Sequence, residues 1–234
     1  MATPTERAGK EPEFSDSPTI VTATRFEYLL TRLAAPRSRV ICGGLRLERL
    51  LVPNPETATA GGSILDGEVI LSGLAGSLVP ELAPGSVLIP SLVADVDGNR
   101  FECDPRLVER LRQSARSRGF EPRDGHLLTA PNIVTGIERQ MWAERGFAAV
   151  EMEAVILART ATPFATVRVI LDSPSRSLSR GWEHPAGALA SLDGWREVAW
   201  LAAAAPLYTL RSARIAATAS NVVAAYSPSS RAKL

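Results

Sequence analysis

Residues 148–159 read AAVEMEAVILAR, an apolar strand pattern that passes directly into an apolar helix pattern. Two carboxylates, Glu151 and Glu153, stand at this junction. Burying a carboxylate costs free energy unless hydrogen bonds or ion pairs compensate it, so the segment predicts a polar site at the edge of the core. Residues two apart on a helix do not face each other, and the pair is therefore not expected to share a proton. A negative charge stabilises the N-terminus of a helix by about 0.3–1 kcal/mol at an exposed end. This role suits Glu151 better than Glu153.

Downstream, residues 163–176 read PFATVRVILDSPSR. We predict a buried strand over residues 166–171, which delivers Asp172 at its carboxyl end. Ligands of open α/β sheets bind beyond the carboxyl ends of the strands, so Asp172 occupies a candidate site position. Asp before Ser-Pro is also common in turns, and this segment alone favours a structural turn.

Upstream, residues 70–78 read ILSGLAGSL. We expect the strand to end here, with Gly73 and Gly76 forming a tight turn that brings the backbone close to a ligand. The spacing of the glycines matches neither a dinucleotide-binding fingerprint nor a phosphate-binding P-loop. Taken alone, the segment therefore predicts turn chemistry only.

Short β-branched runs alternate with helical patterns along the chain, which is typical of an α/β fold with much parallel pairing. Strands are predicted at 19–24, 39–42, 68–72, 86–89, 126–130, 147–150 and 166–171, and helices at 25–35, 45–51, 105–118, 137–145, 152–160 and 192–204, with another after Pro206. Segment 52–67 is predicted to be a loop. We expect one three-layer α/β/α domain with a mixed central sheet over residues 19–226, between flexible tails at 1–18 and 227–234.

Composition narrows the class of ligand. The 234 residues are 45% hydrophobic and include 26 basic and 25 acidic side chains. This balance gives no field that favours nucleic acid, and no apolar run reaches membrane-spanning length, so a small molecule fits better. The polar N-terminus lacks the apolar stretch of a secretory signal, which predicts a cytoplasmic protein. Cys42 and Cys103 have no His at metal-ligand spacing, so we expect core thiols, no metal and no organic cofactor.

Three segments in order resemble the nucleoside phosphorylase and nucleosidase superfamily, which contains purine nucleoside phosphorylases and methylthioadenosine/adenosylhomocysteine nucleosidases. They are SGLAGSL followed by PGSVLIP, VEMEA at 150–154, and VRVILD at 167–172, and the resemblance extends over residues 19–205. It implies cleavage of the N-glycosidic bond of a purine nucleoside, with adenine as the expected base. It also implies a homo-oligomer.

The resemblance implies roles for individual residues. Glu153 would accept hydrogen bonds from the ribose hydroxyls, Met152 would pack against the sugar, and Asp172 would protonate or hydrogen-bond purine N7. Departure of the base builds positive charge on the ribose and negative charge on the purine, so these contacts suit the transition state. To act as the acid, Asp172 must hold a proton, which burial or substrate contact would favour. The other substrate-binding residues implied by these motifs are Glu151, Gly73, Ala75 and Gly76.

The segment TATRFEYLLTRL at 22–33 resembles the family's first strand-to-helix turn, where nucleosidases place a Glu that activates the attacking water. That position is Glu27 in this chain. Phosphorylases more often hold phosphate there with an Arg, and a carboxylate would repel the anion. Hydrolysis is therefore preferred, while the adjacent Arg25 keeps phosphorolysis, with phosphate as a second substrate, as the alternative. A surface Glu on an amphipathic helix is the other interpretation of Glu27.

Two further segments resemble walls of the family's pocket, although both consist of ordinary loop residues. LLTAPNIVTG at 127–136 would bring Asn132, Ile133 and Val134 near the base. Gly43 and Gly44 follow a predicted strand and would lie next to the reacting ribose carbon.

Two residues depart from the family pattern near the acid. Leu171 stands where a small or hydroxyl residue is usual, and Ser77 replaces a common glycine. We therefore expect the hydrogen bond that orients Asp172 to differ. If Leu171 misaligns this acid, the chain would be a non-catalytic nucleoside-binding protein.

The region between the first helix and SGLAGSL is shorter than in typical nucleosidases. This shortening is similar to the hopanoid-associated branch of the superfamily and implies adenosylhopane, in hopanoid synthesis, as an alternative substrate. A bulky apolar 5′ group would then need an opening, lined by the shortened region together with Trp142, Phe164 or Trp182.

Overall fold

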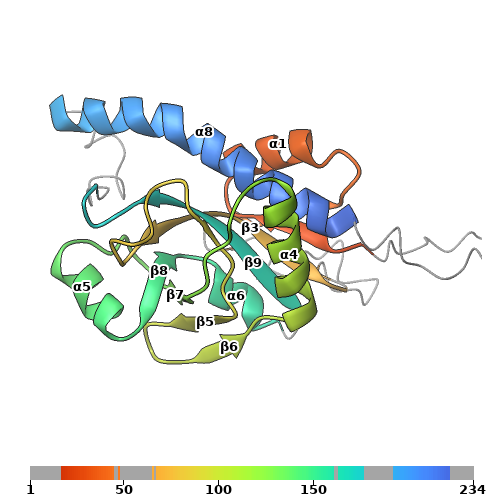
Figure 1. Ribbon diagram of the computed structural model, residues 1–234, viewed down its shortest axis with the longest axis horizontal. Helices are drawn as coiled ribbons and strands as arrows, with labels where there is room; N and C mark the ends of the chain where they lie inside the picture. Colours follow the sequence, from red (N-terminus) through yellow and green to blue (C-terminus); the bar gives the residue numbers. More distant parts are fainter. Residues whose placement is uncertain are drawn as a thin grey trace, which may run out of the picture.

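The computed structural model describes residues 17–44, 47, 65, 67–160, 163–176 and 192–221. The strands are β1 (Thr19–Thr22), β2 (Val40–Cys42), β3 (Val69–Ser77), β4 (Val87–Leu88), β5 (Leu92–Asp95), β6 (Arg100–Glu102), β7 (His126–Thr129), β8 (Phe147–Glu151) and β9 (Phe164–Asp172). The helices are α1 (Arg25–Ala34), α4 (Pro105–Ser117), α5 (Ile137–Glu144), α6 (Ala154–Ala158) and α8 (Leu192–Asn221). These strands form one sheet in the order β2-β1-β3-β8-β7-β5-β6, and β9 pairs with β3 and β4 (Figure 1).

β3 lies at the centre of the sheet and determines where the other strands end. It runs parallel to β1 and β9 and antiparallel to β8. Asp172, the last residue of β9, pairs with Gly76, and Val150 of β8 pairs with the same residue. Because of this register, the carboxyl ends of β8 and β9 both lie beside the second half of β3. The mixed central sheet predicted from the sequence is confirmed.

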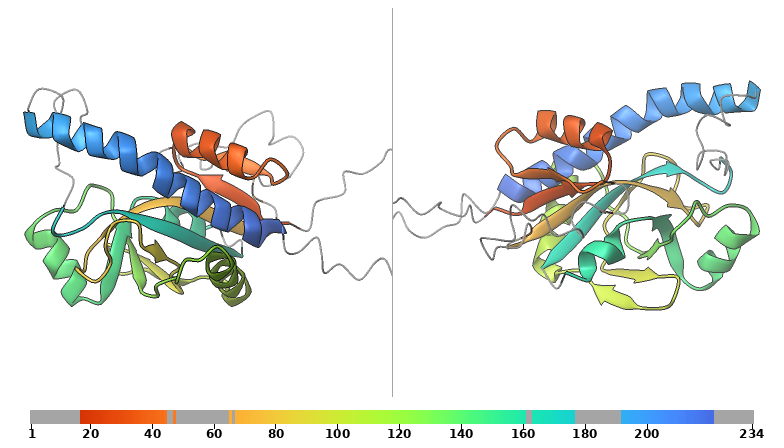
Figure 2. Two further views of the ribbon diagram at one scale, coloured as in Figure 1. Left: turned by 45° about the horizontal axis from the view of Figure 1, so that its top comes forward. Right: turned by 180° about the vertical axis from the view of Figure 1, so that it is seen from behind.

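Helices cover both sides of this sheet, which confirms the three-layer prediction. α1 and α8 lie side by side on one side, and α8 contacts β3 and β9 as well as α4 (Figures 1 and 2). α5 packs against β8, and α6 packs against β5 and β9. The central strands, which lie between the two helix layers, are mostly apolar. In β9 the run from Val167 to Ile170 is fully buried, and Arg168 is its one polar residue.

The chemistry of the helix ends explains where two of these helices begin. Asp104 is the N-cap of α4 and accepts hydrogen bonds from the backbone N–H groups of Arg106 and Leu107, and Pro105 occupies the first helical position. Thr24 and Glu27 form a capping box at the start of α1, where each side chain accepts a bond from the other's backbone N–H.

Two predictions about the secondary structure are wrong, and two strands were missed. β3 does not turn at Gly73 and Gly76 but continues to Ser77. β5 and β6 were not predicted, because their short segments carry charged residues and little periodicity. α8 is one helix with Pro206 inside it, not two helices. A proline removes only one helical hydrogen bond, and α8 packs against α1, α4 and the sheet.

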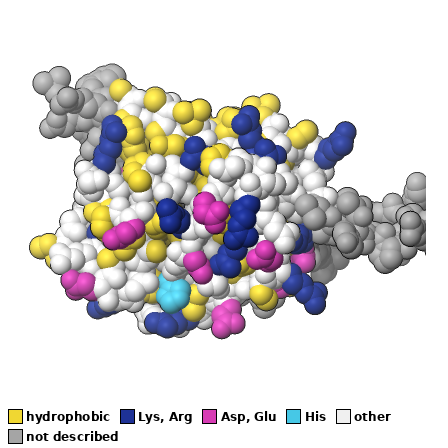
Figure 3. Space-filling model, in the orientation of Figure 1, with side chains coloured by type: hydrophobic (Ala, Val, Ile, Leu, Met, Phe, Trp, Pro, Cys, Tyr) yellow, Lys and Arg dark blue, Asp and Glu magenta, His cyan; other side chains and the backbone are white. Residues whose placement is uncertain are grey.

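Several predictions lie wholly or mostly outside the described residues: the helix at 45–51, the loop at 52–67, both tails and Trp182. None of the helices within the described ranges is long and apolar enough to cross a membrane. On the face shown in Figure 3, basic and acidic side chains are interspersed and do not gather in a patch of one sign. This distribution agrees with the near-zero net charge of +1.

Candidate active site

One pocket of about 200 Å³ opens where the strands β1, β3, β8 and β9 come together. Ligands of α/β sheets bind at such strand ends. The residues that line it come from the turn between β1 and α1, the second half of β3, the loop 132–134, α5, the junction between β8 and α6, and the end of β9. They are Ala23, Thr24, Glu27, Leu74, Ala75, Gly76, Asn132, Ile133, Val134, Arg139, Val150, Glu151, Met152, Glu153, Leu171 and Asp172.

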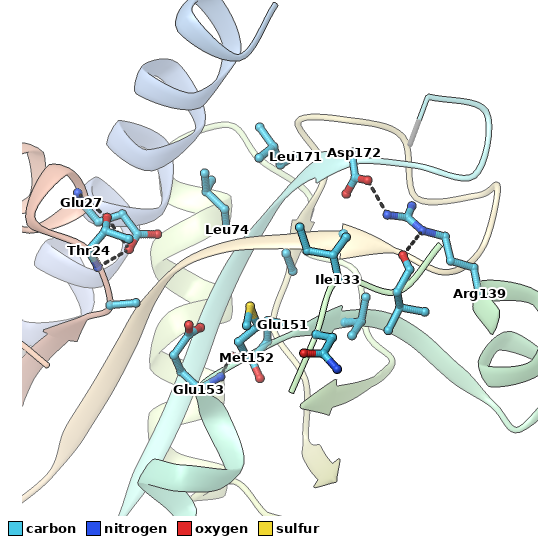
Figure 4. Close-up of a pocket in the computed structure, with 16 residues that line it drawn as sticks. Thr24, Glu27, Leu74, Ile133, Arg139, Glu151, Met152, Glu153, Leu171 and Asp172 are labelled. Atoms are coloured by element: carbon cyan, nitrogen blue, oxygen red, sulfur yellow. Dashed lines mark hydrogen bonds and ion pairs between the residues drawn. The ribbon is translucent and has the colours of Figure 1, made fainter. Parts of the chain in front are cut away.

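The acidic residues divide between the two ends of this pocket (Figure 4). Glu27 and Glu153 point toward the pocket from one side, and Asp172 lies on the other side beside Arg139. Met152 and Ile133 lie between these two groups. The pocket therefore offers carboxylates at both ends and apolar contacts in the middle.

Glu27 is held by the turn that precedes α1. Its Oε2 accepts hydrogen bonds from the backbone N–H of Thr24 at 2.9 Å and from the hydroxyl of Thr24 at 3.1 Å. Its other carboxylate oxygen, Oε1, faces Gly73, where a Cβ would lie only 2.9 Å away. The side chain is buried at the pocket wall and not on the exposed surface of α1, so the alternative interpretation as a surface residue is wrong.

A buried arginine, Arg168 of β9, lies behind this end of the pocket and is only 1% exposed. Its guanidinium forms an ion pair with Glu151, and its Nη2 lies 3.7 Å from Oε2 of Glu153. A Cβ at Gly73 would lie 2.5 Å from Nη1 of Arg168. Gly73 therefore makes room for the guanidinium within a continuous strand. This explains its place in the sequence better than the predicted turn.

Glu151 joins the start of α6 to this charged cluster. Its carboxylate accepts hydrogen bonds from the backbone N–H groups of Glu153 and Ala154, each at about 3.0 Å, and from the hydroxyl of Thr129 at 2.6 Å. It stabilises the first turn of α6, as the sequence predicts, and it also neutralises Arg168. Because protein donors occupy its oxygens, Glu151 supports the site from behind, although it forms part of the pocket lining.

The surroundings of Glu153 favour its protonated form. Burial, together with the negative charges of Glu151 and Glu27, raises the pKa of Glu153 to about 8, although the charge of Arg168 acts in the opposite direction. At neutral pH most of the free protein then carries a neutral Glu153 carboxyl group, which can donate one hydrogen bond and accept others. A polar ligand at this position would find both donors and acceptors.

Asp172 and Arg139 form the opposite end of the pocket, and these residues are 3% and 4% exposed. Nη2 of Arg139 donates to Oδ2 of Asp172. A Cβ at Gly76 would lie 2.5 Å from Oδ1 of Asp172 and 3.2 Å from Nη2 of Arg139. Gly76, like Gly73, leaves space for a charged group and does not form a turn. The structure therefore pairs Asp172, the acid expected from the sequence, with a buried arginine.

The remaining predicted site residues divide into those that line the pocket and those that do not. Ala75, Gly76, Asn132, Ile133, Val134 and Met152 line it. Gly43, Gly44 and Gly73 are absent from the described lining.

The aromatic residues predicted to line a 5′ opening lie elsewhere. Trp142 is buried against Phe147 in a small apolar cluster that also contains Leu78 and Leu128, and Phe164 is buried at the start of β9. Neither lines the pocket as described, so this prediction is wrong for both. Each packs in an apolar core because a large aromatic side chain gains more there than at an open pocket edge.

Sequence reasoning missed Arg139 and Arg168. Arg168 could have been found from the sequence, because it is the one arginine in the otherwise apolar segment that forms β9. A buried arginine needs a carboxylate partner. Arg139 gives no comparable signal, because α5 also carries exposed charged residues and its partners lie far away in the sequence. No cluster of three His, Cys, Asp or Glu side chains suited to a metal ion occurs in the described part of the chain.

Comparisons with known proteins give a family match and a set of similar folds. The sequence matches the phosphorylase superfamily over residues 2–203. No curated protein matches it. One similar structure is a mutant of the Helicobacter pylori 5′-methylthioadenosine/S-adenosylhomocysteine nucleosidase with 5′-methylthioadenosine in the active site. Its TM-score is 0.65 at 15% identity, and the alignment covers 87% of this chain and 97% of that chain.

Two other solved structures are similar to the same extent. The futalosine hydrolase of Helicobacter pylori has a TM-score of 0.64 and 15% identity, with 86% of this chain and 95% of that chain covered. The 5′-methylthioadenosine/S-adenosylhomocysteine nucleosidase from Neisseria meningitidis, in complex with methylthio-immucillin-A, has a TM-score of 0.64 and 19% identity, with 87% and 98% covered. At these identities the likeness shows a shared fold.

Proposed function

The chain belongs to the phosphorylase superfamily, and from this premise we propose that it hydrolyses the N-glycosidic bond of a purine nucleoside, with adenine as the base. The observation that carries the proposal is the presence of Glu27 and Glu153 at one end of a single pocket and Asp172 at the other. The similar nucleosidases and the futalosine hydrolase are named for hydrolytic reactions, which agrees with this reaction class.

In the proposed complex, the ribose lies at the Glu153 end and the base at the Asp172 end. Glu153, mostly protonated in the free protein because its pKa is about 8, exchanges hydrogen bonds with the ribose hydroxyls. Met152 packs against the sugar, and Ile133 and Val134 contact the base. The apolar side chains between the two ends exclude water from the reacting bond, which strengthens the electrostatic contacts around it.

The pairing of Asp172 with Arg139 suits one route for departure of the base. A purine protonated at N7 by solvent donates a hydrogen bond to the Asp172 carboxylate, which stabilises its positive charge. The C1′–N9 bond then breaks, its electron pair moves to N9, and a neutral base leaves an oxocarbenium-like ribose. Water attacks C1′ and gives its proton to Glu27. The products are the free base, a sugar with a new hydroxyl group at C1′, and one proton.

The charges around the ribose end favour water over phosphate as the nucleophile. The guanidinium of Arg168 is already paired with Glu151 and lies 3.7 Å from Glu153, and Glu27 lies at the same end of the pocket. Within the described lining the one cationic side chain is Arg139, and it is paired with Asp172 at the other end. Glu151 is paired with Arg168 and Glu153 is mostly protonated, so a phosphate dianion would meet the negative charge of Glu27 with no unpaired cation of the described lining to offset it. Arg25, which the sequence offered as an anion ligand, is exposed and does not line the pocket.

The 5′ substituent, the cytoplasmic location and the homo-oligomer stay predictions. The shortened region that implies adenosylhopane lies mostly outside the described residues, and the two aromatic side chains placed beside it by the sequence are buried elsewhere.

Release of the free base tests the proposal. The purified chain is incubated with adenosine and with methylthioadenosine, with and without phosphate, and adenine is quantified by chromatography. We expect adenine release that does not depend on phosphate and that falls in the Asp172→Asn variant. Release that requires phosphate would instead support phosphorolysis, and nucleoside binding without release would support the non-catalytic alternative.

A further inference from the structure

Helix α1 exposes an apolar stripe on the side that faces away from the sheet. Phe26, Leu29 and Leu33 are 46%, 61% and 76% exposed. Residues three and four apart lie on one side of a helix, so these three side chains form one continuous surface. The opposite side of α1 carries the buried Glu27 and Thr31. Single exposed apolar residues are ordinary on protein surfaces, whereas a contiguous group of large ones marks an interaction site.

Helix α8 extends this apolar surface. It lies beside α1 in the same layer (Figure 2) and packs against the sheet, α1 and α4, so its remaining side faces solvent. On that side Leu207 is 66% exposed. Figure 3 shows hydrophobic side chains together with basic ones along the upper edge of the molecule, over α1 and α8. The outer surface of this layer is therefore both apolar and basic.

The charges on this surface have one sign. Arg25 precedes Leu29 by four residues and Arg32 follows it by three, so both exposed arginines flank the apolar stripe. Arg214 is also exposed and lies two turns after Leu207 on the same side of α8. None of these arginines forms an ion pair with the described residues. Among the described side chains of α1 and α8, the one carboxylate is that of the buried Glu27.

The charge of this surface decides between the partners that could cover it. We define the α1–α8 face by its exposed large apolar and basic side chains, which are Phe26, Leu29, Leu33 and Leu207 with Arg25, Arg32 and Arg214. A two-fold contact between two copies would bring arginines against arginines, with no described carboxylate of the face to pair them. An anionic partner would instead be attracted.

We propose that the α1–α8 face docks on the surface of a bilayer that contains anionic phospholipids. Interfacial helices combine Phe and Leu side chains, which enter the boundary between headgroups and acyl chains, with arginines that pair with lipid phosphates. No described helix can cross a membrane, so this contact is peripheral and reversible. The docking is independent of the reaction proposed above, because none of the residues of the face lines the pocket.

Cosedimentation of the purified full chain with vesicles tests the docking. The vesicles consist of phosphatidylcholine alone or of phosphatidylcholine with about one third phosphatidylglycerol. Each arginine near an anionic surface strengthens binding about fivefold, so we expect binding at least about tenfold tighter to the anionic vesicles. Raising the salt concentration to about 0.5 M screens these charges and should remove most of that preference.

Substitution of the apolar stripe tests whether the side chains of α1 enter the bilayer. We expect Leu29→Ser/Leu33→Ser to weaken binding to the anionic vesicles at least about tenfold, because less apolar area is then removed from water. The matched control is Ile137→Ser/Met141→Ser on α5, whose side chains are 79% and 44% exposed but lie outside the α1–α8 face. This control should bind the vesicles as tightly as the wild type.

Substitution of the arginines tests the part played by charge. Arg32→Gln/Arg214→Gln should weaken binding to the anionic vesicles about 10- to 25-fold and leave binding to phosphatidylcholine unchanged. Arg100→Gln/Arg106→Gln makes the same change of net charge at exposed positions outside the face, and it should change binding less than about twofold. Equal losses in the two variants would mean that only the net charge matters, which overturns docking through this face.

Three further results would overturn the proposal. The first is a wild-type chain that does not bind the anionic vesicles or binds both kinds of vesicle equally. The second is a dimer, measured by light scattering, that Leu29→Ser/Leu33→Ser converts into a monomer, because a second copy then covers the face. The third is binding of soluble polyglutamate that the same variant abolishes, which assigns the face to an acidic protein. Thermal unfolding checks each variant; if the double variant does not fold, Leu33→Ala replaces it, with an expected loss of about threefold.

Discussion

The burial of Glu153 predicts how stability depends on pH. Burial, with the charges of Glu151 and Glu27, raises the pKa of Glu153 from 4.5 to about 8 in the folded protein. Between these values the folded chain holds a proton that the unfolded chain releases, so stability falls as the pH rises through this window. Each pKa unit corresponds to about 1.4 kcal/mol, and the full difference therefore amounts to several kcal/mol. The loss is complete above the folded-state value.

Glu153→Gln removes the titrating group while keeping the shape of the side chain. We expect the variant to be less sensitive to pH between 5 and 9 than the wild type, and more stable than the wild type at pH 9. Urea unfolding followed by circular dichroism at a series of pH values measures both quantities. The matched control is Glu81→Gln, because Glu81 is exposed, and its pH dependence should equal that of the wild type. A wild-type stability that is flat from pH 5 to 9, or that rises, would refute the reasoning.

Three other predictions concern the pocket. Glu27→Gln should lower kcat by about 10²–10⁴-fold with little change in KM, because it removes the base for water but keeps a capping residue at the same position; steady-state kinetics measures this, and an unchanged kcat would exclude Glu27 as the base. Gly73→Ala should destabilise the fold by about 1–3 kcal/mol, because its Cβ would lie 2.5 Å from Arg168; denaturant unfolding tests it, and a change below about 0.5 kcal/mol would contradict it. Asp172→Asn should lower kcat/KM for adenosine by about 10²–10³-fold, in line with the loss of one charge-stabilising contact, and full activity in this variant would remove Asp172 from the mechanism.

Local sequence patterns predicted the elements that carry the site. The strand before Asp172 and the strand-to-helix junction at Glu153 are present, because apolar runs bounded by polar residues specify buried strands directly. The apolar spacing at Leu107, Leu111 and Ala115 likewise predicted the buried face of α4. Each of these predictions rests on the spacing of apolar residues within a single segment of the chain.

The features that were missed depend on partners far away in the chain. Arg139 binds Asp172, 33 residues later, and Ser77, 62 residues earlier, so no local pattern reveals its role. Gly73 and Gly76 suggest a turn in isolation, whereas in the structure they leave room for Arg168 and Asp172 beside the continuous strand β3. Pro206 suggests a break, but the tertiary contacts of α8 outweigh one lost helical hydrogen bond.

Hydrolysis in water enriched in ¹⁸O tests the central claim most directly. The purified chain is incubated with adenosine in this water, and the products are analysed by mass spectrometry in the presence of phosphate. The account predicts free adenine together with ribose that carries one ¹⁸O atom at C1, formed at the same rate with and without phosphate. Formation of ribose 1-phosphate, or recovery of intact nucleoside from a folded protein that binds it, would contradict the claim.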